Sequence, residues 1–215
     1  EEGFSVNTFI ALAKKHIDSA LAENRLPILV GGTSFYFNAL EHGLSELPES
    51  TSESREHFNK LLASEGSEKL HQKLQGIDPN SASRIHPNDS QRITRALEVH
   101  YLSGQTLSKL QGHKSINKLS QSIKKIILMP DRPELHKRIE KRFIRMMNEG
   151  FLEEVKTLRK NKNLNLDLPS MRCVGYRQAW QHLDGEFDKQ TMIDKSIAAT
   201  RQLCKRQCTW LRNEN

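Results

Sequence analysis

Apolar residues recur three or four positions apart over several stretches of this chain, with polar residues between them. This spacing predicts amphipathic helices at about residues 6–23, 34–42 and 133–148, and a final helix at about 188–212. Each of these segments places its apolar residues on one stripe, so each is expected to pack one side against a core.

Two short apolar runs have a different pattern, because their apolar residues are nearly continuous. Residues 27–30 and 123–129 are typical of strands buried on both faces of a parallel sheet. The first run ends in Gly31-Gly32-Thr33 and leads into the helix predicted at 34–42. Helix, buried strand, glycine-rich turn and helix together indicate an α/β fold.

Between the two predicted strands the chain changes character. Helical stretches follow one another from about residue 46 to 117 without an intervening strand, and prolines separate them. This predicts an all-α insertion at 46–117 within an α/β core formed by residues 1–45 and 118–215. The chain as a whole is therefore predicted to be predominantly helical.

The formal net charge of the 215 residues is +7, and the pI is about 9.4. Such a balance favours a polyanionic partner, although it also fits a basic soluble protein with no such partner. No apolar run approaches the roughly 20 residues that span a bilayer. The start of the chain is acidic, unlike a signal peptide. We therefore expect a cytoplasmic protein with no membrane partner.

The three cysteines are an odd number without the spacing of a disulfide framework, which is typical of a reducing compartment. Cys204 and Cys208 are four apart on the final predicted helix. No histidine lies nearby at ligand spacing, so we interpret them as core thiols rather than metal ligands. The prediction for metal ligands in this chain is therefore none.

The segment Arg172-Cys173-Val174-Gly175-Tyr176-Arg177 follows a helix-breaking proline, Pro169. Two cations beside a flat ring and a glycine suit a phosphate backbone and an unstacked base. The alternative is a helix N-terminus with solvated arginines and a packed tyrosine.

The final helix carries a one-sided positive charge. Arg201, Lys205 and Arg212 lie within roughly 40° of one another at about 100° per residue. No acidic residue occurs from 195 to 213, whereas solvated helices usually mix both signs. Trp210 could add a stacking plane for a base, or it could be a buried anchor.

A smaller basic segment, Gln91-Arg92-Ile93-Thr94-Arg95, begins the helix that Asn88-Asp89-Ser90 opens. Its two arginines share a face, and a helix N-terminus favours anions. Basic residues on a helix are often only solvated, so this segment by itself is weak evidence.

Two further features bear on phosphate chemistry. Gly31-Gly32-Thr33 stands where open α/β sheets bind ligands, although a tight strand-to-helix turn explains it equally well. Asp131 follows the second predicted strand and is either a Mg²⁺ ligand or a helix cap. The chain contains no G-x-x-x-x-G-K-[ST] phosphate-binding loop.

Taken together, four of these segments resemble the bacterial tRNA dimethylallyltransferase family. They occur in order over nearly the whole chain, which makes the resemblance specific. The matching stretches are residues 27–33, Ile85-His86-Pro87-Asn88-Asp89 with residues 91–98, Leu168-Pro169-Ser170 with residues 172–177, and residues 199–203 with 205–212.

The resemblance implies a P-loop α/β core with a helical insertion. It also implies an enzyme that is a monomer when complete and uses Mg²⁺. Such an enzyme transfers a dimethylallyl group from dimethylallyl diphosphate to the exocyclic amine of the adenosine 3′ of the tRNA anticodon. Thr33 would lie in the reaction channel as a catalytic residue, with Gly31 and Gly32 near the diphosphate. The resemblance implies that the tRNA anticodon stem-loop contacts Arg55, Gln91, Arg92, Ile93, Thr94, Arg95, Arg172, Cys173, Val174, Gly175, Tyr176, Arg177, Lys205, Arg206, Gln207, Cys208, Thr209, Trp210, Leu211 and Arg212.

One part of the family pattern is not matched. The family's phosphate-binding loop and the aspartate that acts as its general base lie in a segment N-terminal to Glu1. The 215 residues by themselves are therefore expected to be inactive in prenyl transfer. The alternative function is a non-catalytic tRNA- or RNA-binding module. A P-loop kinase for a small molecule is disfavoured, because the basic motifs are too extended for a small substrate.

Overall fold

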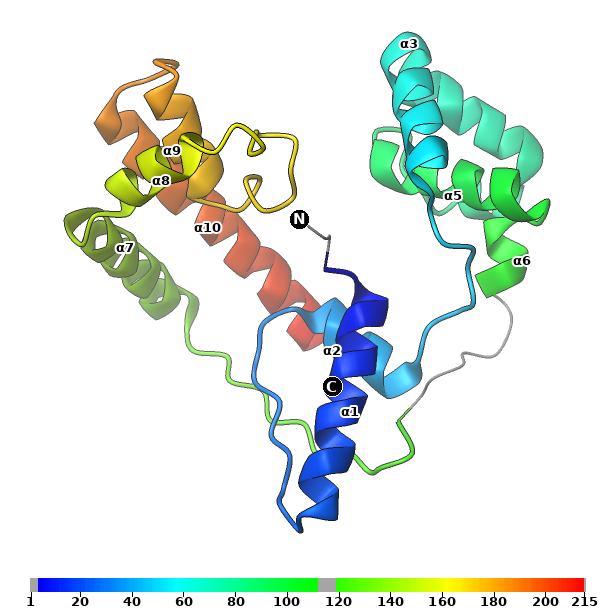
Figure 1. Cartoon of the computed structure of the whole chain (residues 1–215), viewed down its shortest axis with the longest axis horizontal. Helices are drawn as coiled ribbons and strands as arrows, with labels where there is room; N and C mark the ends of the chain where they lie inside the picture. The colour runs from blue at the N-terminus through cyan, green and yellow to red at the C-terminus, as the bar shows by residue number, and fades with distance from the viewer. Residues whose placement is uncertain (1–3, 112–118, 215) are drawn as a thin grey trace. The chain divides into compact units, whose positions relative to one another are not determined.

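The computed structural model describes residues 4–111 and 119–214, and all regular structure in those ranges is helical (Figure 1). The chain divides into two compact units. Unit one comprises Glu1–Tyr36 and Ile123–Asn215, and unit two comprises Phe37–Ser122. Within the ranges just given, no helix combines the length and the apolar character needed to cross a bilayer.

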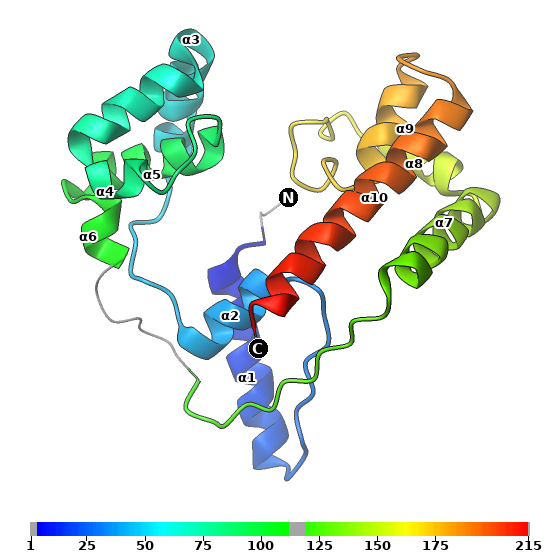
Figure 2. The ribbon, with the colours of Figure 1, turned by 180° about the vertical axis from the view of Figure 1, so that it is seen from behind.

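Unit one is built around the packing of its C-terminal helices. Helix α10 packs on α7 and α9, and α8 packs on the same two helices (Figure 2). The helices of this unit are α1 (Val6–Ala22), α7 (Arg132–Asn148), α8 (Phe151–Arg159), α9 (Tyr176–Leu183) and α10 (Lys189–Arg212). The core shared by α7, α8, α9 and α10 contains Phe143, Phe151, Val155, Ala179, Met192 and Ile197.

Helix α1 confirms the helix predicted at 6–23. The Ser5 hydroxyl accepts a hydrogen bond from the Thr8 backbone N–H at 3.1 Å and caps the helix. The ring of Phe9 stacks on Tyr36, with ring centroids 4.8 Å apart. The start of helix α2 (Ser34–His42), which spans the boundary between the units, is thereby packed against α1.

Helix α10 confirms the final predicted helix. Its first turn is capped by Asp188, whose carboxylate accepts from the Thr191 N–H at 2.7 Å. Ile197 is buried, as the apolar stripe predicted. The stripe did not include Met192 and Ser196, although both are fully buried. The Ser196 hydroxyl donates to the Met192 carbonyl at 2.8 Å, which satisfies it inside the helix.

Unit two is a helical bundle with its own core. Helix α3 packs on α4 and α5, and α6 packs on the same two helices. The helices are α3 (Ser52–Ile77), α4 (Pro79–Ala82), α5 (Ser90–Ser103) and α6 (Leu107–Gln111). Fully buried apolar side chains at its centre are Leu70, Leu74, Ile93 and Val99.

A buried carboxylate joins the start of α3 to α5. Glu98 accepts hydrogen bonds from the hydroxyls of Ser50 and Ser54, each at 2.6 Å, and from the Arg95 guanidinium at 2.8 Å. Burial alone would raise the pKa of Glu98, but the bonds from Ser50, Ser54 and Arg95 outweigh it, and the net pKa is lowered. Glu98 is therefore a satisfied structural anion.

A second buried carboxylate, Asp78, links α4 to α6. It accepts from the Ser81 N–H at 3.0 Å, from the Ser81 hydroxyl at 2.7 Å and from the Ser108 N–H at 2.9 Å. Burial acts to raise the pKa of Asp78, but the bonds from Ser108 and Ser81 prevail and lower it from 3.8 to about 2. The folded state therefore favours the ionised carboxylate.

We expect Asp78→Ala to lower the free energy of unfolding by about 1–3 kcal/mol at neutral pH, because three donors lose their buried acceptor. Because the folded pKa is depressed, the stabilisation by Asp78 is present above the ordinary pKa of 3.8 and is lost as pH falls towards about 2. Urea unfolding at a series of pH values measures this loss. The difference in free energy of unfolding between the variant and the unsubstituted chain should become smaller as the pH falls through that window. Asp18→Ala, at an exposed position of α1, is the control. A difference independent of pH would contradict the assignment.

The two predicted strands are wrong for the part of the chain that the structure describes. Residues 27–30 and 123–129 run without helix or strand (Figure 1). Most of their apolar side chains face solvent, with Val30 91% and Leu128 83% exposed. A strand requires the backbone groups of a neighbour, and neither run is paired among the described residues.

The predicted helical insertion at 46–117 is helical as far as the structure describes it, from α3 to α6. Its last residues, 112–117, and residue 118, where the predicted core was to resume, lie outside the described residues. The boundaries of this insertion stay a prediction.

Candidate nucleic-acid interface

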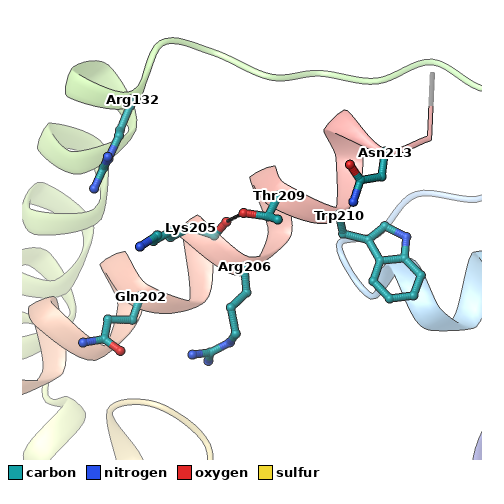
Figure 3. Close-up of a pocket in the computed structure, with 7 residues that line it drawn as sticks. All are labelled: Arg132, Gln202, Lys205, Arg206, Thr209, Trp210 and Asn213. Atoms are coloured by element: carbon teal, nitrogen blue, oxygen red, sulfur yellow. Dashed lines mark hydrogen bonds between the residues drawn. The ribbon is translucent and has the colours of Figure 1, made fainter. Parts of the chain in front are cut away.

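An open groove of about 670 Å³ runs along α10 in unit one (Figure 3). The seven residues that line it include three cations and no carboxylate, so the groove attracts anions. One of the cations, Arg132, is the first residue of α7, and the other six residues belong to the end of α10 or follow it. They are Gln202, Lys205, Arg206, Thr209, Trp210 and Asn213.

The three cations approach the groove from different directions. Figure 3 shows Lys205 leaving α10 on the side of Arg132, whereas Arg206 leaves the helix on another side. All three side chains are exposed. The sequence interpretation missed Arg132, because it considered only the neighbouring Asp131. The carboxylate of Asp131 makes no capping hydrogen bond to α7.

The glycine-rich turn lies against the same helix. The Gln207 side-chain amide donates to the Gly32 carbonyl at 2.9 Å, joining two segments 175 residues apart. A Cβ atom on Gly32 would stand 2.6 Å from the Gln207 Nε2 atom, so this close approach suits glycine. The structure therefore brings Gly31-Gly32-Thr33 and the basic segment of α10 together. The Thr33 side chain is exposed.

Trp210 is 40% exposed, so it is neither a fully exposed stacking plane for a base nor a fully buried anchor. Its indole N–H donates to Glu214 Oε1 at 3.0 Å, and Lys125 binds Glu214 Oε2 at 2.7 Å. The indole is therefore partly held by its neighbours and partly accessible from the groove.

The basic face of α10 is smaller than predicted. Arg201 is half-buried and forms an ion pair with Glu140 of α7 at 2.8 Å, so its charge joins two helices. Lys205 and Arg212 are exposed, as predicted. Cys208 and Leu211 are half-buried. Cys204 is half-buried, and this burial and, to a lesser extent, the neighbouring Cys208 raise the pKa of its thiol.

The arginines of the segment 172–177 face solvent. Arg172 lies 3.6 Å from Asp167, an exposed carboxylate that screens its charge only weakly. Arg177 is exposed at the start of α9. Cys173 is also exposed, and Val174 is half-buried. Two cations are therefore accessible at this end of α9.

Tyr176 is packed more firmly than a free stacking plane would be. Its ring meets Phe151 edge to face, with centroids 5.3 Å apart. Its hydroxyl donates a hydrogen bond to Glu154. This bond is the main cause, and burial the second cause, of a raised pKa at Tyr176. The preceding Gly175 has φ of +96° and directs the chain into α9. The structure thus gives Tyr176 and Gly175 a supporting position at the edge of the core.

The segment 91–95 lies in unit two, at the start of α5. Gln91 and Arg92 are exposed, and Arg92 lies 3.2 Å from Asp89. Ile93 is fully buried. The Thr94 hydroxyl donates to the Ser90 carbonyl at 2.9 Å.

Arg95, in the same segment, is half-buried and structural. It donates to Ser50 and Glu98 and also to the Pro48 carbonyl at 2.7 Å. Arg55 of α3 is exposed. In unit two the accessible members of the predicted set are therefore Gln91, Arg92 and Arg55.

The described residues do not fit the Mg²⁺ that the resemblance implies. In the ranges 4–111 and 119–214, no group of three histidine, cysteine, aspartate or glutamate side chains is close enough to hold a metal ion. Asp131 is exposed and stands without such a group.

The sequence pattern of the IPP transferase family matches residues 1–214. The chain belongs to this family. The chain is 63% identical to the tRNA dimethylallyltransferase of Ruthia magnifica subsp. Calyptogena magnifica, over 100% of this chain and 70% of that protein. It is 50% identical to the tRNA dimethylallyltransferase of Alkalilimnicola ehrlichii, over 99% of this chain and 67% of that protein.

Solved structures agree with this family membership. The chain superimposes on the full-length tRNA isopentenylpyrophosphate transferase of Bacillus halodurans with a TM-score of 0.61 and 34% identity, over 99% of this chain and 65% of that one. A eukaryotic dimethylallyltransferase acting on tRNA gives a TM-score of 0.74 over 98% of this chain and 53% of that one. Its identity is 24%, so that likeness supports the fold alone.

Proposed function

We propose that this member of the IPP transferase family takes part in transferring a dimethylallyl group from dimethylallyl diphosphate to the exocyclic amine of the adenosine 3′ of a tRNA anticodon. The observation that carries the proposal is the cationic groove of α10, which lies on the helix that holds the Gly31-Gly32-Thr33 turn. The identity of 63% to a tRNA dimethylallyltransferase supports it.

The reaction has two stages, extrusion of the adenine and transfer of the prenyl group. The adenine must leave its stack, because its amine is inaccessible within the stem-loop. This extrusion costs about a few kcal/mol. The bond between the allylic carbon and the diphosphate oxygen then breaks as a bond from the adenine nitrogen forms, and the nitrogen gives up a proton. The protein must hold the RNA, stabilise the departing negative charge and exclude water.

Most of the described site residues serve to hold the RNA. Lys205, Arg206 and Arg132 would bind phosphates of the anticodon stem-loop in the groove of unit one. Arg172 and Arg177 add cations at the start of α9. In unit two, Gln91 and Arg92 are the exposed members of the basic segment that begins α5, and Arg55 is exposed on α3.

Thr33 is the described residue that we assign to the reaction channel. Its exposed hydroxyl, at the turn held by Gln207, can donate a hydrogen bond to the diphosphate or to the extruded base. We assign the proton acceptor to none of the described residues.

A second candidate function is binding of tRNA without transfer. The 215 residues contain no phosphate-binding loop motif, which favours this reading for a polypeptide of these residues alone. Such a polypeptide should bind an anticodon stem-loop and leave it unmodified when supplied with dimethylallyl diphosphate. Turnover by this polypeptide would contradict the second candidate.

Thr33→Ala tests the first candidate in the protein expressed from its whole gene. We expect kcat for prenylation of an anticodon stem-loop to fall on the order of 10²-fold, because one preorganised donor is removed from the channel. The Kd for the stem-loop should change little. Labelled dimethylallyl diphosphate measures the rate and fluorescence anisotropy measures binding.

Thr157→Ala, at an exposed hydroxyl of α8, is the matched control and should leave both quantities unchanged. A Thr33→Ala protein with an unaltered rate would remove Thr33 from the site.

A further inference from the structure

Gln207 points away from the groove that the basic residues beside it line, and contacts another segment of the chain. Lys205 and Arg206 line the groove, whereas the half-buried Gln207 side chain reaches the glycine-rich turn. Successive residues of a helix point about 100° apart, so one turn of α10 presents both the groove cations and this amide.

The contact has two geometric components. The Gln207 Nε2 atom donates to the Gly32 carbonyl at 2.9 Å, and the same nitrogen stands 2.6 Å from the place of a Cβ on Gly32. The amide therefore fills the space that a side chain at Gly32 would need. A glutamine and a glycine at these two positions fit each other.

The turn is held from its other end by α1. Tyr36, in the first turn of α2, stacks on Phe9, and its backbone N–H donates to the Thr33 carbonyl at 2.9 Å. Thr33 thus stands between two attachments, the aromatic contact with α1 and the amide contact with α10. Loss of either attachment would let the Thr33 hydroxyl move relative to the groove.

We propose that Gln207 is a positioning residue that holds Gly31-Gly32-Thr33 against α10, so that Thr33 keeps a fixed place relative to the phosphate-binding groove. The effect on catalysis rests on the proposed function. The Gln207–Gly32 contact, which we call the tether, does not. It assigns to Gln207 a role inside the protein, in place of the tRNA contact that the resemblance implies.

Gln207→Glu provides the sharpest test, because it keeps the length of the side chain and replaces the donor with a carboxylate that repels the Gly32 carbonyl. We expect hydrogen–deuterium exchange of the peptide covering residues 31–36 to rise about 2- to 10-fold, as expected for the loss of one hydrogen bond. Gln207→Met keeps a side chain of similar length but has no hydrogen-bond donor. It should also raise the exchange of this peptide. Gln190→Glu, on an exposed residue in the first turn of α10, is the control and should leave this peptide unchanged.

A double-mutant cycle tests the fit between the two positions. Gly32→Ala should raise exchange of the turn when Gln207 is present, because its Cβ meets the amide. The additional effect of Gly32→Ala in the Q207A background should be clearly smaller. Equal effects in both backgrounds would overturn the proposed fit.

The kinetic measurement separates positioning from RNA contact. In the protein expressed from its whole gene, Gln207→Met should lower kcat about 10-fold while the Kd for the stem-loop stays within about 2-fold, since it removes the amide donor without adding a negative charge beside the phosphate-binding cations. A weaker Kd with an unchanged kcat would overturn the proposal and make Gln207 an RNA contact. Unchanged exchange in residues 31–36 would overturn it as well. If the unsubstituted protein transfers no prenyl group, the proposed function fails, and the exchange results alone uphold or overturn the tether.

Discussion

Replacing Lys205 and Arg206 together with glutamine is expected to weaken binding of a tRNA anticodon stem-loop about 10²-fold. Each cation lies exposed in a groove whose lining contains no carboxylate, so each is free to bind a phosphate. A hydrogen bond to a charged group contributes about 1.5–3 kcal/mol, which is roughly 10-fold or more in affinity for each residue. Gln202 and Thr209 would remain as neutral donors, so binding should be weakened and not abolished.

The salt dependence gives a second, independent measure of the same prediction. Each phosphate contact that is lost should reduce the slope of log K against log salt by about 0.7–0.9. Fluorescence anisotropy at several salt concentrations measures both quantities on one sample. Lys160→Gln with Lys162→Gln, at exposed positions after α8, removes the same charge away from the groove. An equal loss of affinity in this control would show that net charge, and not the groove, determines binding.

Gly175→Val is expected to lower the free energy of unfolding by about 2–5 kcal/mol. The glycine has φ of +96°, which is strained for a β-branched residue by about 1–3 kcal/mol. A Cβ at this position would already touch the rings of Phe143 and Phe151, each at 3.5 Å. The methyl groups of valine would extend beyond it into this cluster, and overpacking a core costs typically about 1–3 kcal/mol.

Gly150→Val is the comparison for this loss. Gly150 also has φ of +96°, but nothing lies within 4 Å of a Cβ placed on it. Its ψ of 19° is left-handed, whereas ψ of Gly175 is −57°, so Gly150→Val should lose only a backbone contribution, and a smaller one than at Gly175. Urea unfolding of both variants measures the difference, and equal losses would show that the contacts of Gly175 with the aromatic rings contribute nothing.

The predicted tRNA-binding segments contain two kinds of residue. Arg172, Arg177 and Lys205 present exposed cations. Ile93 is fully buried, and Arg95 is held by the Glu98 network. A sequence motif contains both exposed cations and buried supporting residues, because a binding surface needs a rigid support that fixes the positions of its charges.

The helices could be predicted from the sequence because helical hydrogen bonds are local and the apolar stripe repeats every 3–4 residues. The predicted helix at 6–23 is observed as Val6–Ala22, and the one at 133–148 as Arg132–Asn148. The positive charge of α10 could also be read directly from its composition. These properties depend on residues that are neighbours along the chain.

Residues 27–30 and 123–129 were predicted as strands and are unpaired where the structure describes them. Arg201, expected on the basic face, instead pairs with Glu140, and Gln207 reaches Gly32 across 175 residues of sequence. The sequence by itself therefore determined the helices, their apolar stripes and the excess of positive charge. Only the tertiary structure decided which cations are neutralised by a partner, which side chains are buried and what meets the glycine-rich turn. The physical reason is that strand pairing, ion pairs and burial each require a second group, whose position depends on the folding of the whole chain.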